Sequence, residues 1–259
     1  MEALMSDLSV SRADGVVKVV FDRPRVLNAL TPALLFELVE TCERIANDET
    51  TKVVRFEGAG KSFSAGADLP AFLSSLNGSD AREIADLGRR ATNAIAELPQ
   101  ITIAGITGHC VGGGLVLASA CDIRIADYSA RFLIPELDAG IPLAWGGLEW
   151  VVRLIGETMA ADLVLSCRPV EAEEALQAGL ISRVVSPGAL QQELATLESQ
   201  IAAKPRHVLR VTKGQLLQIR GGTFDAKNDA DALLAALKDP ESMEQGMRYV
   251  AKRIQKASE

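Results

Sequence analysis

Two glycine-containing loops carry the residues best suited to chemistry. Gly112 to Gly114 follow the apolar segment 101–106 and precede an Ala-rich apolar stretch, a pattern that predicts a strand, a turn and a helix. Glycines at a helix N-terminus leave backbone N–H groups accessible to an anion, or to an oxygen that gains negative charge during a reaction. A second loop, Phe63-Ser-Ala-Gly-Ala-Asp68, follows another apolar segment. Two N–H groups from two separate loops predict an oxyanion hole.

Length, composition and charge narrow the class of protein. The 259 residues are enough for one large core, or for a core with a small appendage. No apolar run reaches the roughly 18 residues of a membrane span, so we expect no membrane partner. The N-terminus lacks the basic region of a signal peptide, and the scattered cysteines fit a reducing compartment, which favours a cytoplasmic location. The net charge of −7 argues against a nucleic-acid partner.

Histidine and cysteine offer little for metal or base chemistry. The two histidines, His109 and His207, are far apart in the sequence, and the four cysteines show no CxxC spacing. We therefore expect no metal site. His109 lies beside the glycine-rich loop, where we interpret it as a packing residue rather than a base.

Alternating strand and helix signals indicate how the loops are positioned. Two alternating apolar segments flank Ala13-Asp14-Gly15, which predicts a β-hairpin, and Thr31-Pro32 marks the start of a helix. The segments expected to form strands are 8–13, 16–21, 52–57, 101–106, 122–126 and 180–185. Because helices separate most of these strands, we expect an α/β protein with a mostly parallel sheet covered by helices.

Helical signals dominate the rest of the chain. Residues 70–80 are an exception, because they are rich in Ser, Asn and Gly and are expected to form a mobile loop. The C-terminal helices are amphipathic, so they are expected to cover the core or to pack on another subunit. The further helices are expected at 81–97, 146–155, 158–166 and 171–178, and over most of 198–259.

Six short motifs, taken in order and spacing, resemble the crotonase (enoyl-CoA hydratase/isomerase) superfamily over nearly the whole chain. The resemblance implies a crotonase-like ββα spiral core over 1–197 and a helical trimerisation region over 198–259. It also implies an acyl-CoA thioester as substrate, with coenzyme A as part of the substrate and no separate cofactor, and a homotrimer or dimer of trimers. The motifs are Asp22 to Leu30, Phe63 to Leu69, Gly108 to Gly114, Ala120 to Arg124, Pro135 to Pro142 and Ala178 to Ile181.

The resemblance also implies roles for individual residues. Ala67 and Gly113 would supply the two N–H groups of the oxyanion hole. Independently of the resemblance, we expect Trp145 either to form a wall of the acyl pocket or to pack in the core. Further residues that the resemblance places near coenzyme A are Ala65, Gly66, Asp68 and Leu69 at its adenine end, with Arg25, Tyr249 and Lys252.

One position departs from the hydratase pattern and decides the expected chemistry. Hydratases that this chain resembles hold a water between two glutamates, and Glu136 occupies one of those positions whereas Val116 occupies the other. Valine neither accepts nor donates a proton, so half of the machinery for water addition is missing. Dienoyl-CoA isomerases carry an acid at the Val116 position and at a second position that is Ala144 here, which argues against that activity.

A single carboxylate is sufficient to move a double bond. We therefore expect a 3,2-enoyl-CoA isomerase, the group closest in site pattern, in which Glu136 removes a proton at C2 of a 3-enoyl-CoA and returns it at C4. Two alternatives stay open: a weak enoyl-CoA hydratase, and an acyl-CoA-binding protein without catalysis. In the first, Glu149 could replace the missing acid if the loop around Trp145 folds inward.

Overall fold

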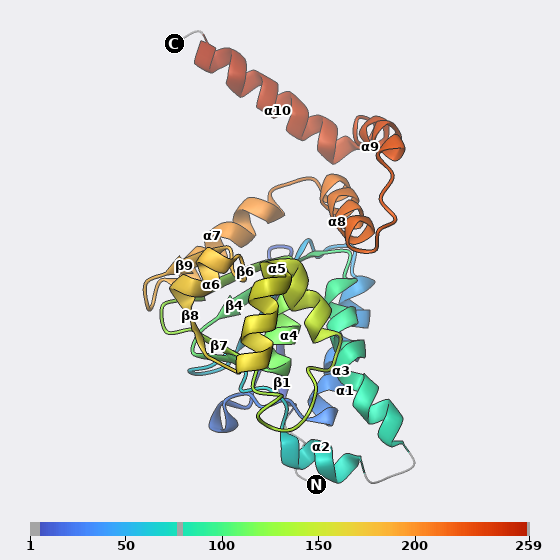
Figure 1. Cartoon of the computed structure of the whole chain (residues 1–259). Coiled ribbons are helices and arrows are strands. Elements are labelled where there is room, and N and C mark those ends of the chain that lie inside the picture. Colours follow the sequence, from blue (N-terminus) through green and yellow to red (C-terminus); the bar gives the residue numbers. More distant parts are fainter. Residues whose placement is uncertain (1–5, 77–79, 258–259) are drawn as a thin grey trace.

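The computed structural model describes residues 6–76 and 80–257, which form two β-sheets and a set of surrounding helices (Figure 1). The main sheet contains β1 (Leu8–Ala13), β2 (Val16–Phe21), β3 (Val53–Gly58), β4 (Ile101–Ile106), β6 (Ile123–Asp127) and β9 (Arg183–Val185), in that spatial order. β1 pairs antiparallel with β2, and the other neighbours are parallel. A smaller sheet contains β5 (His109–Val111), β7 (Arg131–Leu133) and β8 (Val170–Glu171).

The hairpin and the parallel strands follow from local sequence. Asp14 and Gly15 have φ values of 51° and 76°, the left-handed conformations that a two-residue hairpin turn requires. Every residue of β4 is buried, as expected for a central parallel strand covered on both faces. The two faces of the sheet bury alternate residues, so that Ile103 and Ala104 belong to different apolar clusters.

Helices cover both faces of the main sheet. α7 (Leu190–Ala202) packs on the Ile103 face, and α1 (Pro32–Ala46), α3 (Ala81–Ala96) and α4 (Gly113–Ala120) contribute to the larger cluster on the other. Thr31 caps α1 as expected, since its hydroxyl accepts the N–H of Leu34 at 3.1 Å. The remaining core helices are α5 (Gly147–Ser166), which is broken at the non-helical Gly156, and α6 (Ala172–Ala178).

Residues 69–75 are helical, which corrects the prediction of a mobile loop over 70–80. They form α2 (Leu69–Ser75), and the Asp68 carboxylate caps this helix by accepting the N–H of Ala71 at 3.3 Å. Pro70 in the first turn adds a second helix-start signal, and burial of Phe72 holds the helix on the core. Residues 77–79 of the predicted loop lie outside the described residues.

Two further differences concern short strands. The strand predicted over 180–185 begins only at Arg183, because the Leu180 N–H still donates to the Ala175 carbonyl at 2.9 Å as part of the α6 C-terminus. The small sheet was not predicted, since its strands have only two or three residues and no periodic pattern.

The C-terminal region is helical, as expected. It contains α8 (Arg206–Arg220), α9 (Asp229–Ala236) and α10 (Pro240–Ala257), and α10 extends away from the body of the molecule (Figure 1). The expected domain boundary after residue 197 falls within α7, so this division of the chain stays a prediction.

A buried ion cluster attaches α8 to the main sheet. The Asp122 carboxylate, at the start of β6, accepts hydrogen bonds from Lys213 at 2.7 Å and 2.8 Å, from Arg220 at 3.0 Å and from the Thr102 N–H at 2.9 Å. Burial alone would raise the pKa of Asp122, but the Lys213 ammonium and its other donors outweigh burial and hold that pKa below its ordinary value. Asp122 therefore anchors the start of β6 to α8.

Candidate active site

Backbone hydrogen bonds join the two glycine-containing loops. The Ser64 N–H donates to the His109 carbonyl at 2.9 Å, and the Val111 N–H donates to the Ser64 carbonyl at 3.0 Å. The first loop is also bonded to the segment before α1, because the Leu30 N–H donates to the Gly66 carbonyl at 2.8 Å. These bonds hold the loop that ends at Asp68 directly beside the start of α4.

The two predicted oxyanion-hole residues, Ala67 and Gly113, line the same cavity. Gly66 has a φ of +92°, and a β-carbon at this residue would lie 2.9 Å from the Val111 carbonyl oxygen and 3.7 Å from the Gly113 nitrogen. Gly66 is therefore required for the close approach of the two loops. Gly113 is the first residue of α4 and has no acceptor within the helix. Within 6–76 and 80–257, neither the Ala67 nor the Gly113 N–H donates a hydrogen bond to the protein.

The Glu136 carboxylate lies against the glycine triplet. A β-carbon at Gly112 would lie 2.6 Å from Glu136 Oε1, so a side chain there would force the carboxylate to move from this position. The other oxygen, Oε2, is buried and has no hydrogen-bond partner among the described residues. Burial raises the pKa of Glu136, and a hydrogen bond from its own backbone opposes that rise only in part. A carboxylate with a raised pKa suits a group that takes up and returns a proton.

A cavity of about 250 Å³ lies in front of Glu136 and both oxyanion-hole residues. Among its described lining residues Glu136 is the only ionisable one, and the others are apolar. Val116 lines this cavity and is 1% exposed. Ala144 also lines it. The two residues occupy the positions at which we expected dienoyl-CoA isomerases to carry acids. The lining residues are Ala67, Leu69, Phe72, Leu73, Leu76, Ala85, Gly113, Val116, Glu136, Ile141, Pro142, Leu143, Ala144 and Trp145.

The cavity thus brings together the two predicted N–H donors, Glu136, Val116, Trp145 and Leu69. Sequence reasoning did not single out Phe72 and Leu73 of α2, or Leu76 directly after it, because it assigned this segment to a loop. Their spacing of three or four residues was the signal that could have identified one helical face. Sequence reasoning also missed Leu143, which had no such pattern.

Other predicted site residues lie away from the cavity. Arg25 is exposed in the 3-10 helix Pro24–Val26, and Tyr249 and Lys252 lie on α10, exposed and outside the lining of the cavity (Figure 1). Trp145 lines the cavity, but Glu149 is exposed on α5, pairs with Arg153 at 2.5 Å and lies outside the lining, so it does not replace the missing acid. The contacts of coenzyme A with Arg25, Tyr249 and Lys252 stay predictions.

The residues predicted at the adenine end are held by hydrogen bonds between the first loop and the segment 23–27. The Ala65 N–H donates to the Leu27 carbonyl at 2.8 Å, and the Asp68 carboxylate accepts from Arg23 at 3.2 Å in addition to capping α2. Together with Gly66 and Leu69, these residues stay predicted contacts of the coenzyme. His109 is exposed in β5.

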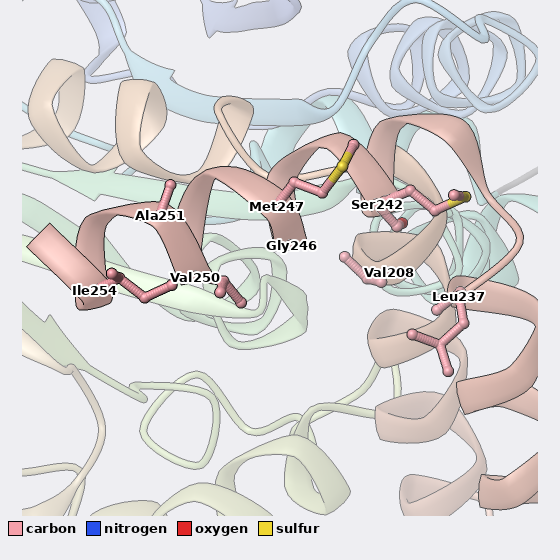
Figure 2. A pocket seen from close by; sticks show the side chains of 10 residues that line it. Val208, Leu237, Ser242, Gly246, Met247, Val250, Ala251 and Ile254 are labelled. Carbon is pink, nitrogen blue, oxygen red and sulfur yellow. The ribbon is translucent and has the colours of Figure 1, made fainter.

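A second hollow, of about 730 Å³, lies between the C-terminal helices (Figure 2). We call it the C-terminal groove, and its lining is apolar except for Ser242. Met247 and Ile254 of α10 are 64% and 63% exposed, so this helix carries a large unpaired apolar surface. The lining residues are Val208, Ala236, Leu237, Ser242, Met243, Gly246, Met247, Val250, Ala251 and Ile254.

Comparison with known proteins identifies the family. The model of the family described as Enoyl-CoA hydratase/isomerase matches residues 11–255, so the chain belongs to this family of enzymes that act on acyl-CoA. The crystal structure of an enoyl-CoA hydratase from Bacillus anthracis superposes with a TM-score of 0.88 at 31% identity, covering 95% of this chain and 96% of that one. An enoyl-CoA hydratase/carnithine racemase from Magnetospirillum magneticum superposes with a TM-score of 0.89 at 31% identity, over 96% of this chain and 94% of that one. The predicted α/β crotonase fold is thereby confirmed.

Curated relatives include both hydratases and isomerases. The crotonyl-CoA hydratase of Syntrophomonas wolfei is 32% identical over 208 residues, which cover 80% of each chain. The mitochondrial Delta(3,5)-Delta(2,4)-dienoyl-CoA isomerase of Mus musculus is 35% identical over 226 residues, or 83% of this chain and 69% of the relative. These relatives do not single out 3,2-enoyl-CoA isomerisation as the activity of this chain. Because the mouse relative is named as mitochondrial, the cytoplasmic location stays a prediction. No described helix is long and apolar enough to cross a membrane.

Proposed function

We propose that the protein converts a 3-enoyl-CoA into the conjugated 2-enoyl-CoA. The observation that carries this proposal is the composition of the cavity, in which Glu136 is the only ionisable group among the described lining residues. A double-bond shift needs one group that accepts a proton at one carbon and returns it at another. Hydration, by contrast, needs a second polar group to hold and activate the water.

In the proposed reaction, the Glu136 carboxylate removes a proton from C2 of the substrate. The C2–H electron pair forms the C1–C2 double bond, and negative charge develops on the thioester oxygen. The free N–H groups of Ala67 and Gly113 donate to that oxygen and stabilise the dienolate. The thioester carbonyl then re-forms, the double bond moves to C2–C3, and the protonated Glu136 returns its proton to C4.

Packing around Val116 supports this proposal over water addition. A β-carbon at Gly147 would lie 2.5 Å from Val116 Cγ2, so valine at this position is tightly enclosed by the start of α5. A water near Glu136 would find no second carboxylate among the described residues that line the cavity. Hydration remains the second candidate, because relatives at about one-third identity are named hydratases.

The test measures exchange at C2 and conjugation at the same time. The protein is incubated with a 3-enoyl-CoA in deuterated water, and formation of the 2-enoyl product is followed by ultraviolet absorbance and mass spectrometry. The proposal expects C2–H exchange with conjugated product, and no 3-hydroxyacyl-CoA from crotonyl-CoA. Water addition to crotonyl-CoA without isomerisation would favour a hydratase, and saturable binding without either reaction would favour an acyl-CoA-binding protein.

We also propose that a second copy of this chain covers the C-terminal groove, in a homotrimer or a dimer of trimers. The exposed apolar surface of α10 supports this, because such patches on a folded protein usually mark contacts with another protein. Tyr249 and Lys252 lie on the same helix and would then reach a neighbour's coenzyme A. Sedimentation analysis of the wild type and of Val250→Asp tests the proposal: we expect a trimer or hexamer that dissociates in the variant, and a monomeric wild type would contradict it.

A further inference from the structure

Trp145 adopts a backbone conformation that is unusual for a large side chain. Its φ is +60°, in the left-handed region, and Gly146 follows with a φ of +73°. Bulky residues rarely take this conformation unless the surrounding structure holds them in it. The two consecutive left-handed residues immediately precede α5, and the Trp145 side chain lines the cavity.

Two glycines on different helices make room for the indole ring. A β-carbon at Gly88, in the middle of α3, would lie 2.0 Å from the Trp145 ring atoms Cδ2 and Cε2. A β-carbon at Gly113 would lie 2.1 Å from Cζ3 of the same ring. Real β-carbons do not approach other atoms this closely, so any side chain at either position would displace the indole.

The indole also contacts α2. The ring centroids of Trp145 and Phe72 are 5.8 Å apart with an interplanar angle of 41°, and Phe72 is 8% exposed. One side chain therefore packs against α2, α3 and the first residue of α4 while it borders the cavity. Gly113 is the residue whose N–H we assign to the oxyanion hole, so the indole stands directly beside the reacting end of the cavity.

We infer that Trp145 is the specificity-determining wall of the acyl site, and that it restricts the site to short or medium, uncharged hydrocarbon chains. This inference shares one premise with the proposed function, namely that the acyl group of a CoA thioester occupies the cavity. The cavity, at about 250 Å³, lies below the range of roughly 300–1,000 Å³ that is usual for pockets that hold drug-sized ligands. Its described lining contains no cationic side chain, so a carboxylate at the end of the acyl chain would be buried without a partner.

The test uses binding rather than turnover. Affinities for butanoyl-, hexanoyl-, octanoyl- and dodecanoyl-CoA, and for free coenzyme A as the baseline, are measured by isothermal titration calorimetry. Trp145→Ala removes the wall, and we expect it to shift the ratio of dodecanoyl- to butanoyl-CoA affinity by at least about tenfold towards the longer chain. Trp145→Phe, which keeps an aromatic ring, should shift this ratio less. In the wild type, adipyl-CoA should bind at least about tenfold more weakly than hexanoyl-CoA.

Gly88→Ala, a substitution in α3, tests the role of Trp145 without changing Trp145 itself. The added methyl group must displace the indole. We expect this displacement to narrow the cavity, so the preference should move towards shorter chains, opposite to Trp145→Ala. In the double variant the methyl group enters vacated space, and the effect of Gly88→Ala should largely disappear. Trp150→Phe is the matched control, because Trp150 lies on α5 outside the cavity and stacks on Arg220 at 5.5 Å.

The outcomes separate this inference from the proposed function. A folded Trp145→Ala protein with an unchanged chain-length profile would overturn the role of Trp145, and so would an equal shift in Trp150→Phe. If the profile moves as expected but no isomerisation occurs, the wall is established and the proposed reaction is wrong. If the wild type binds free coenzyme A and every acyl-CoA equally, the acyl chain does not occupy the cavity and the inference fails.

Discussion

Replacing Glu136 by Gln is expected to abolish isomerisation and to stabilise the folded protein. The loss of the proton acceptor should lower kcat by about 10²–10⁴-fold. A buried polar atom without a partner costs about 1–3 kcal/mol, and Glu136 Oε2 is such an atom among the described residues. Because the Glu136 residue is only partly buried and glutamine keeps a polar group, we expect a gain of about 1 kcal/mol in the free energy of unfolding.

The pH dependence of this gain follows from the pKa of the carboxyl. Burial raises the pKa of Glu136 above its ordinary value of 4.5, so the charged form is disfavoured in the folded state. Stability that depends on this group is fully present below pH 4.5 and is lost as the pH rises through the raised pKa of the folded protein. The stabilisation by glutamine should therefore be larger at pH 7 than at pH 4.

Thermal unfolding at the two pH values, together with turnover and acyl-CoA binding, checks this prediction. One kcal/mol corresponds to a rise in Tm of about 2–4 °C for a chain of this size. Glu149→Gln is the matched control, since Glu149 is exposed, lies outside the cavity and should change the free energy of unfolding by less than about 0.5 kcal/mol. A Glu136→Gln protein that keeps its turnover, or that loses stability more at pH 7 than at pH 4, would refute the reasoning.

Three further substitutions test the elements that position the site. Gly66→Ala should lower kcat by about 10²-fold and the free energy of unfolding by about 1–3 kcal/mol. The reason is that Gly66 has a φ of +92° and the added methyl group would press on the second loop. Turnover measures the first effect and urea unfolding the second. Lys213→Ala removes one of the donors to the buried Asp122 carboxylate and should lower the free energy of unfolding by about 3 kcal/mol. An unchanged midpoint of urea unfolding would contradict the anchoring role of this ion cluster. Asp68→Ala removes the cap of α2 and should cost about 1 kcal/mol, with faster hydrogen exchange confined to that helix.

The sequence alone determined the features that depend on local chemistry. Glycines are typical of tight turns and of helix starts, so residue type and spacing were enough to predict that Gly66 and Gly113 lie in two loops that form one site. The hairpin at Asp14-Gly15 and the cap at Thr31 are equally local. The presence of Glu136 and the absence of an acid at Val116 define the available proton chemistry, and both can be read directly from the residue types.

Tertiary structure decided what depends on contacts between distant segments. The small sheet joins strands too short to show a period, and α2 gains its stability from burial of Phe72 as well as from its cap. Whether Trp145 packed in the core or lined the pocket could not be read from the sequence, because Gly88 is far away in the chain and only the fold brings it under the indole. Likewise, amphipathic periodicity predicted the C-terminal helix but not its direction, because helix propensity does not specify where a helix lies, and only the folded chain shows that α10 extends away from the core (Figure 1).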